Sequence, residues 1–208
     1  MIDYNNDVIT QIADLLFQRA DSETQFIKAA YEFVRDRISH SADINEDIIT
    51  CCASEVLKAG HGICFAKSHL LAALLHCKAV PTGLCYKKLI LDDETAPVLI
   101  YHGLNGVYIK EYKKWIRLDA RGNKEGVNAQ FSLDEEYLAF PVRPEKGGED
   151  YFTVCFVATE NGKITGFACY DSSAMGFFGP IGVEPTRRGE KIGQALLVRT
   201  LSAMKEYG

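Results

Sequence analysis

The sequence predicts an α+β protein, in which a helical N-terminal layer and a central cysteine-bearing helix pack on an antiparallel sheet. Apolar residues recur at helical spacing before residue 38 and again over 64–75. Segments typical of strands follow over 84–119. A shorter β-β-β-α pattern occupies 151–208, and we expect it to form an incomplete second unit after the main fold.

Two helices are predicted near the start of the chain. Asp7 is a candidate cap for a helix over 7–19. Ser22-Glu23-Thr24-Gln25 fits a capping box, and an apolar stripe continues from it to about residue 38. We interpret both helices as a packing layer. A polar loop follows them, so we expect His40 to be solvated rather than catalytic.

A short helix over 53–58 leads through two glycines to Cys64, at the start of the apolar helix. Gly60 and Gly62 can adopt backbone conformations that let the chain turn tightly here. A thiol in the first helical turn lies near unpaired N–H groups and the positive end of the helix dipole, which favour the thiolate. Cys64 is therefore a candidate nucleophile, although free cysteine is also a common core residue.

Two histidines flank Cys64, but neither is our first choice as its base. His61 lies in the tight turn before the helix. His69 lies five residues along the helix, away from the thiol's side of the first turn. The predicted strands downstream offer a better candidate.

His102 lies in a predicted strand over 98–109, and Asp119 ends the next one, over 114–119. A thiolate that attacks an amide carbonyl needs an imidazole to carry the proton, and the imidazole needs an acceptor that fixes its orientation and tautomer. Cys64, His102 and Asp119 supply these three roles in this order.

The pairing of these two strands raises a difficulty. A simple ladder that turns near Tyr112 would set Asp119 opposite Asn105 rather than opposite His102. We expect a bulge at a nearby glycine to absorb the offset. Alternatively, Asn105-Gly106 forms a tight hairpin turn that redefines the pairing.

Four motifs in this order resemble the core of the transglutaminase-like (papain-like) superfamily over about residues 45–125: Gly62-x-Cys64, Val80-Pro81-Thr82, His102 and Trp115-x-x-x-Asp119. The resemblance implies that the thiol attacks a carboxamide or related acyl bond, and that water or an amine resolves the thioester without a cofactor. Ala79 stands where the family usually has glycine. If that residue is left-handed, alanine costs about 1 kcal/mol.

Composition divides the chain into a domain over 1–143, a linker over 144–150 rich in glycine and charge, and a segment over 151–208. In the last segment, two strand-like runs flank Asn161-Gly162, which is a strong hairpin signal. A third strand over 177–183 and a helix over 192–207 follow.

One part of this segment resembles GCN5-related N-acetyltransferases: the end of the third strand, the next loop and the start of the helix. The resemblance implies an acetyl-CoA pyrophosphate site at four residues: Val183, Arg188, Gly189 and Gly193. However, Lys191 replaces the central glycine of that loop, and Glu190 adds a negative charge. Further strands of that family are also missing, so we expect weak or no acetyl-CoA binding. We expect this unit to dock on the first domain, to form a homodimer with a second copy, or to be a truncated remnant.

The composition argues against several classes of protein. The 208 residues carry a net charge of −5, which disfavours nucleic acid as a partner. Seven cysteines without a C-x-x-C pair argue against a disulfide framework or a zinc site. There is no membrane-spanning run and no signal-like N-terminus. We expect a cytoplasmic protein without a membrane partner.

We conclude from the sequence that the chain carries out thiol-dependent acyl transfer or hydrolysis on a peptide, protein or small amide. Hydrolysis is our preference over cross-linking. One alternative is a binding or scaffold protein that keeps the fold without the chemistry. A second alternative is an acetyl-CoA-dependent N-acetyltransferase.

Overall fold

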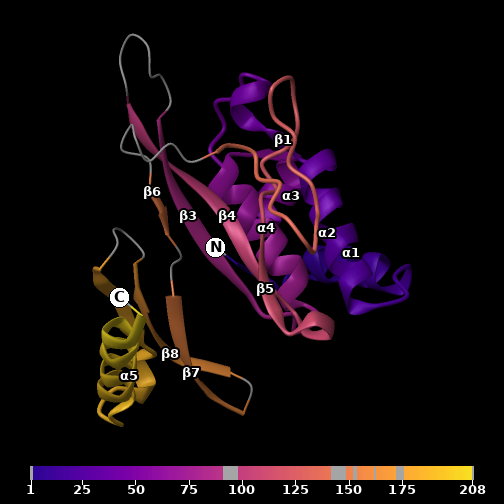
Figure 1. Cartoon of the computed structure of the whole chain (residues 1–208). Helices are drawn as coiled ribbons and strands as arrows, with labels where there is room; N and C mark the ends of the chain where they lie inside the picture. Colours follow the sequence, from indigo (N-terminus) through magenta and orange to yellow (C-terminus); the bar gives the residue numbers. More distant parts are fainter. Residues whose placement is uncertain are drawn as a thin grey trace. The chain divides into compact units, whose positions relative to one another are not determined.

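We analysed a computed structural model of the chain (Figure 1). The structure describes residues 2–90, 98–141, 149–151, 154–161, 163–171 and 176–207. It separates into two compact units, Met1–Glu149 and Asp150–Gly208, and each unit is described by itself. The predicted linker over 144–150 lies outside the described residues except for its last two positions.

Two capped helices begin the first unit. In α1 (Asp7–Gln18) the cap is Asn6, whose side chain accepts a hydrogen bond from the Val8 N–H, so the prediction of Asp7 as the cap was wrong by one residue. In α2 (Glu23–Arg37) the predicted cap Ser22 accepts from the Gln25 N–H. The buried face of α2 packs on the central helix, as expected for a packing layer.

A short parallel pair of strands and two glycines prepare the start of the central helix. The helix α3 (Ala53–Ala59) ends at Gly60, which is left-handed with φ of +73°. β1 (Ser39–His40), which precedes α3, pairs in parallel with β2 (His61–Gly62), which follows α3. At Gly62, an added Cβ would lie 3.0 Å from the Ala66 Cβ. Gly60 is therefore needed for its backbone conformation, and Gly62 for the space it leaves.

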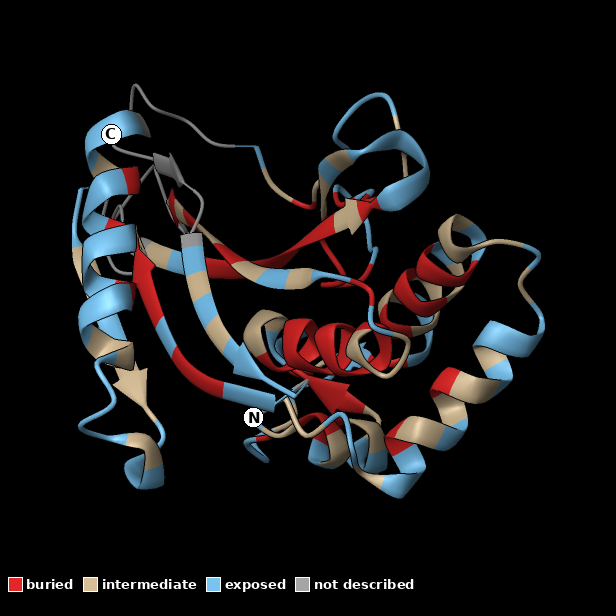
Figure 2. Ribbon diagram, turned by 90° about the horizontal axis from the view of Figure 1, so that it is seen from below, coloured by how far each residue is buried: buried red, intermediate tan, exposed pale blue. Residues whose placement is uncertain are grey.

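The central helix, α4 (Cys64–His76), is buried at every residue from Ala66 to Leu75. Figure 2 shows it as the run of buried residues in the middle of the first unit. It packs against α1, α2 and α3 and against β3 and β4 of the sheet. The prediction of a helix buried on most of its surface is confirmed. At its C-terminal end, Ala79 has φ of +54°, which is the left-handed conformation expected from the resemblance.

The sheet beside α4 has the strand order β5-β4-β3-β6. Its strands are β3 (Thr82–Ile90), β4 (Leu99–Ile109), β5 (Lys114–Leu118) and β6 (Glu149–Tyr151). β4 pairs antiparallel with β3 and with β5. Asn105-Gly106 lies inside β4, so the alternative of a hairpin turn there was wrong.

Short 3₁₀ turns occur at Ser41–Asp43, Lys110–Tyr112 and Pro185–Arg187.

The second unit is a three-stranded antiparallel sheet with one helix. Its strand order is β7-β8-β9, formed by β7 (Val154–Glu160), β8 (Lys163–Tyr170) and β9 (Phe178–Val183). The first two strands flank Asn161, which is left-handed with φ of +50°, as the hairpin signal predicts. The helix α5 (Ile192–Tyr207) packs on these strands. The predicted β-β-β-α order of this segment is confirmed.

Candidate active site

Cys64 is the first residue of α4, and its thiol is half-buried. Ile63 precedes it in an extended conformation, and no side chain caps this helix start in the described part of the chain. The backbone N–H groups of the first turn are therefore directed toward the region of the thiol, as the sequence predicts.

β4 approaches the start of α4 closely at Gly103. A Cβ at this position would lie 2.8 Å from the Phe65 ring and 3.2 Å from the Phe65 Cα, so only glycine fits. The Gly103 N–H faces the Cys64 Sγ at 3.5 Å. This close approach brings the preceding residue, His102, to the thiol.

His102 and Asp119 form a buried pair, with His102 Nε2 and Asp119 Oδ2 2.8 Å apart. The β4–β5 ladder sets Asn105 opposite Leu118 and has no shift over its five pairs. Continued by one residue, this register makes His102 the diagonal neighbour of Asp119 on the same face of the sheet. Diagonal neighbours lie within reach of a long side chain. The expected bulge was therefore wrong, because the imidazole itself spans the offset.

Both carboxylate oxygens of Asp119 accept backbone hydrogen bonds. The Arg121 N–H donates to Oδ1 at 3.2 Å, and the Ala139 N–H donates to Oδ2 at 3.0 Å. Burial acts to raise the pKa of Asp119, but the hydrogen bond from His102 and these two N–H groups outweigh it and lower the pKa. Asp119 is therefore a carboxylate held in one orientation.

The side chains of His102 and His40 interact with the Cys64 thiol and favour its thiolate. Burial acts to raise the pKa of Cys64, but these contacts, the charge of His102 and the Gly103 N–H lower it to about 6. Burial likewise opposes the charge on His102, but Asp119 and Cys64 raise the pKa of His102 to about 9. Between these values the thiolate and the imidazolium form an ion pair.

His40 was missed by the sequence reasoning, since it is not a solvated side chain. It is half-buried, and its side chain acts to lower the pKa of the Cys64 thiol. Its position depends on the β1–β2 pairing, in which His40 faces Gly62. Two-residue strands carry no recognisable sequence pattern, so no signal could have placed His40 here.

Lys67 is a second residue that the sequence reasoning missed. It lies one helical turn after Cys64 and is fully buried. Its Nζ donates to the carbonyl oxygens of Ile38, of Arg121 at 2.8 Å and of Arg35 at 3.4 Å. Burial lowers the pKa of Lys67 to about 8, so the group is still mainly an ammonium at neutral pH. It joins α4 to the segments that carry His40 and Asp119.

The other two histidines near Cys64 have different partners. His61 Nδ1 lies 3.1 Å from Ser41 Oγ, and His69 Nδ1 lies 2.9 Å from the Cys51 carbonyl oxygen. Neither is among the main groups that shift the pKa of Cys64. The preference for His102 over both of them as the base is consistent with this geometry.

The loop predicted to bind acetyl-CoA contains two left-handed residues and charged side chains that pair with one another. Gly189 and Lys191 have φ of +93° and +63°, so Lys191 adopts the conformation expected of the glycine that it replaces. Glu190 pairs with Arg187 at 2.7 Å, and Arg187 also pairs with Glu160 at 2.6 Å. Glu190 is therefore paired within the protein, although it shares Arg187 with Glu160.

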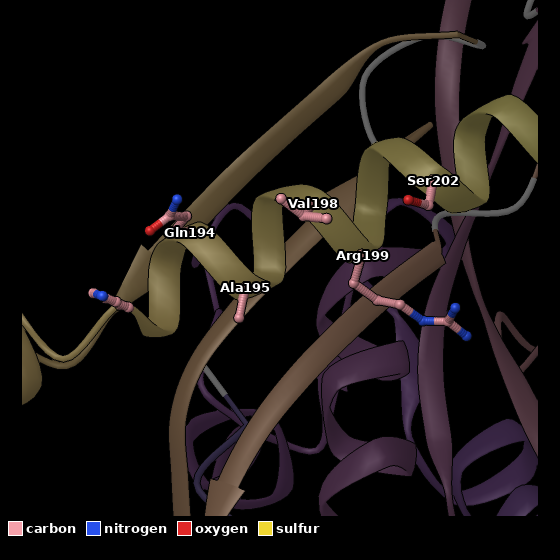
Figure 3. Close-up of a pocket in the computed structure, with 6 residues that line it drawn as sticks. Gln194, Ala195, Val198, Arg199 and Ser202 are labelled. Carbon is pink, nitrogen blue, oxygen red and sulfur yellow. The ribbon is translucent and has the colours of Figure 1, made fainter.

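A shallow pocket of about 520 Å³ runs along α5, and Figure 3 shows the side chains that line it. Its lining residues are Lys191, Gln194, Ala195, Val198, Arg199 and Ser202. The predicted acetyl-CoA residues Val183, Arg188, Gly189 and Gly193 do not line this pocket. Among the residues that the structure describes, no cluster of three or more histidine, cysteine or acidic side chains is arranged to hold a metal ion.

Comparison with protein families matches residues 10–120 to the transglutaminase-like superfamily. The match covers more than half of the chain, and the chain belongs to this superfamily. It begins earlier than the resemblance seen in the sequence, because it includes most of the helical layer. No comparison supports the acetyltransferase resemblance of residues 151–208, which stays a prediction.

The chain is also similar to parts of several solved structures. One from Cytophaga hutchinsonii, provisionally named a cysteine protease, is 16% identical over 55% of this chain and 37% of its own, with a TM-score of 0.42. A protein named as a TGase is 20% identical over 62% of this chain and 34% of its own, with a TM-score of 0.44. This chain thus spans about a third of their length. Among curated proteins there is no match, and no described helix is long and apolar enough to cross a membrane.

Proposed function

We propose that the chain is a thiol-dependent enzyme that cleaves or transfers an acyl group at an amide or peptide bond. Cys64 is the nucleophile, His102 the base and then the acid, and Asp119 the orienting carboxylate. The observation that carries the proposal is the buried hydrogen bond between His102 and Asp119 beside Cys64, together with the lowering of the Cys64 pKa to about 6 by the His102 side chain. Membership of the superfamily supports the class of chemistry.

The proposed reaction begins from the thiolate–imidazolium pair. The Cys64 sulfur attacks the carbonyl carbon, and the electron pair of the C=O π bond moves to oxygen. When this intermediate collapses, the C–N bond breaks and His102 gives its proton to the departing amine. The thioester left on Cys64 is then attacked by water or by a second amine, which His102 deprotonates.

The position of His102 suits both proton transfers. The ring is buried, and Phe140 covers it edge-on with the ring centres 5.3 Å apart. The hydrogen bond from Nε2 to Asp119 leaves Nδ1 for the thiol side. Because Asp119 stabilises the imidazolium, the proton stays on the ring until the leaving group needs it.

Turnover measured against a panel of peptide, isopeptide and glutamine-containing amide substrates tests this function. The wild-type protein should release amine, and intact-mass analysis of quenched reactions should find the acyl group on Cys64. Added primary amine separates the two second steps, because hydrolysis leaves an acid and transfer leaves a new amide. We expect hydrolysis to predominate.

Two cysteine variants control the experiment. Cys64→Ala should lose turnover completely. Cys77→Ala should keep it, because Cys77 lies at the other end of α4, where its sulfur donates to the Tyr4 carbonyl oxygen. Turnover that survives in Cys64→Ala would contradict Cys64 as the nucleophile. No acylation of any substrate by the wild type would instead favour the scaffold alternative.

A further inference from the structure

The second unit carries two cysteines on neighbouring strands. Cys155 lies in β7 and Cys169 lies in β8, and the β7–β8 ladder sets the two residues directly opposite each other. The register shift of this ladder lies between Ala158 and Thr159, beyond Cys155, so the pairing is regular at the cysteines. Opposite residues of an antiparallel pair direct their side chains to the same face of the sheet. The two thiols therefore lie side by side on one face.

The backbone hydrogen bonds of β8 show which kind of cross-strand pair this is. The Asp171 N–H donates to the Phe177 carbonyl oxygen at 2.9 Å, on the side of β8 that faces β9. The C=O and N–H of one peptide group point in opposite directions, so the Tyr170 C=O points toward β7. This direction alternates along a regular strand, so Cys169 directs its backbone groups away from β7. Cys155 and Cys169 are therefore a non-hydrogen-bonded pair.

A pair of this kind has the spacing that a disulfide requires. In a non-hydrogen-bonded pair the Cα atoms lie about 4.5 Å apart, and the side chains are closer than in a hydrogen-bonded pair. Disulfides join Cα atoms that are roughly 4.4 to 6.8 Å apart. The two thiols also affect one another more than any other group does, since Cys169 lowers the pKa of Cys155 and Cys155 raises the pKa of Cys169.

The two cysteines differ in exposure. Cys155 is exposed, whereas Cys169 is buried beside it. A reagent in solution therefore reaches Cys155 first, and Cys169 is placed to react with whatever forms on Cys155. An exposed thiol with a second thiol next to it is the arrangement of a reversible oxidation site.

We propose that Cys155 and Cys169 are a site of reversible oxidation, which closes to a disulfide by exchange with a small disulfide such as glutathione disulfide. The inference is independent of the proposed function, because it uses neither Cys64 nor an amide substrate. One reversible cross-link of this kind also differs from a disulfide framework, which the cysteine pattern argues against.

The exchange proceeds in two steps that balance. The Cys155 thiolate attacks one sulfur of the small disulfide, whose S–S bond breaks and releases a thiolate. Cys169 then gives up its proton, and its sulfur attacks the Cys155 sulfur and displaces the second thiolate. The protein loses two electrons and two protons, which the small disulfide gains as it becomes two thiols. Because Cys155 is exposed, an added thiol reverses both steps.

Two variants of the full chain are compared with the wild type. Cys169→Ala removes the buried partner. The matched control combines Cys155→Ala with Val157→Cys, which moves the exposed thiol two residues along β7 on the same face. Val157 is exposed and lies opposite Phe167, so its replacement is only a diagonal neighbour of Cys169. Diagonal neighbours lie about 7–8 Å apart, which is too far for a disulfide. Circular dichroism verifies that each variant is folded.

Each protein is incubated with glutathione disulfide, its free thiols are blocked with iodoacetamide, and it is digested with trypsin without reduction. Trypsin cleaves after Lys163, between the two cysteines, so a disulfide joins two peptides that reduction separates. We expect the joined peptides in the wild type. Cys169→Ala should instead retain glutathione on Cys155, at least about tenfold more than the wild type does, because no neighbouring thiol displaces it. The control should retain glutathione on its moved thiol.

Two results would overturn the proposal. One is a wild-type protein in which Cys155 and Cys169 stay free or carry only glutathione. The other is a control whose moved thiol joins Cys169 as readily as Cys155 does in the wild type, because the register of the ladder would then not select the pair. Neither result depends on turnover of an amide, so the proposed function and this inference fail separately.

Discussion

Both units contain a loop with left-handed residues that leads into a helix, but only one of these helix starts is surrounded by reactive side chains. At α4, His102 and His40 come from separate strands and meet at Cys64. At α5, the loop charges pair with one another, since Arg187 bonds Glu190 and Glu160.

The burial of the two helices differs in the same way. α4 is covered by helices and by the sheet, so that only its two ends, Cys64 and Phe65 at the start and His76 at the other, are partly exposed. α5 exposes large apolar side chains, Leu197, Val198 and Leu201, along its length. A helix start thus becomes a candidate site when the rest of the fold encloses the helix and brings other strands to that end.

The largest contrast between the units should appear when a carboxylate is changed to its amide in each. In Asp119→Asn the amide can still bond His102, but it no longer stabilises the imidazolium or fixes the tautomer. We expect kcat to fall roughly 10³–10⁴-fold, measured with the best substrate from the amide panel. Glu190→Gln, which removes an exposed carboxylate of the second unit, should leave kcat within twofold. Equal losses in both variants would contradict the account.

The pH dependence of turnover should be set by titrating groups of the first unit alone. Activity rises as Cys64 loses its proton, and the pKa of Cys64 is about 6. It falls when His102 loses the proton that the leaving amine needs, and the pKa of His102 is about 9. We expect a bell-shaped pH profile of kcat/KM, with midpoints near pH 6 and pH 9 on its two limbs. Outside these midpoints, kcat/KM should change about tenfold per pH unit. A profile that rises steadily above pH 9 would argue against His102 as the acid.

Replacing one lysine in each unit should separate buried from exposed charges. Lys67→Met leaves the carbonyl oxygens of Ile38 and Arg121 without their donor, and it should lower the free energy of unfolding by about 3 kcal/mol. The matched change Lys191→Met removes an exposed side chain and should shift stability by less than about 0.5 kcal/mol. Urea denaturation measures both. A stable Lys67→Met would show that these carbonyls find other partners.

The smallest expected effect lies at the C-terminal end of α4. Ala79 has φ of +54° and is exposed, so its Cβ is strained without any packing in return. Ala79→Gly should raise the free energy of unfolding by about 1 kcal/mol, seen as a higher urea midpoint. Gly60→Ala places a Cβ on a left-handed residue at the end of α3. It should lower the free energy of unfolding by a similar amount. A destabilised Ala79→Gly would mean that the strain is relieved elsewhere.

The features that sequence could predict are those encoded by local pattern. Ser22 caps α2 because its hydroxyl is three residues from the N–H that it accepts from. The two strands on either side of Asn161 follow from turn chemistry, and the buried α4 follows from its run of apolar residues. Cys64, His102 and Asp119 were selected because each stands in, or directly after, an element whose type could be recognised.

The features that sequence missed depend on contacts between distant segments. His40 reaches Cys64 only because two very short strands pair in parallel. Lys67 looks like a solvated lysine until three carbonyls converge on it. The diagonal arrangement of His102 and Asp119 depends on the register, where a shift of one residue changes which face a side chain occupies.

The central claim, that Cys64 is an activated nucleophile, is tested most directly by the rate of iodoacetamide alkylation at each cysteine as a function of pH. Peptide mapping of the full chain resolves Cys64 from the other six cysteines. We predict that Cys64 reacts much faster than the others at pH 7, with a midpoint near pH 6, well below the ~8.5 of free cysteine. Equally slow alkylation of all seven, with a Cys64 midpoint above about 8.5, would contradict the account.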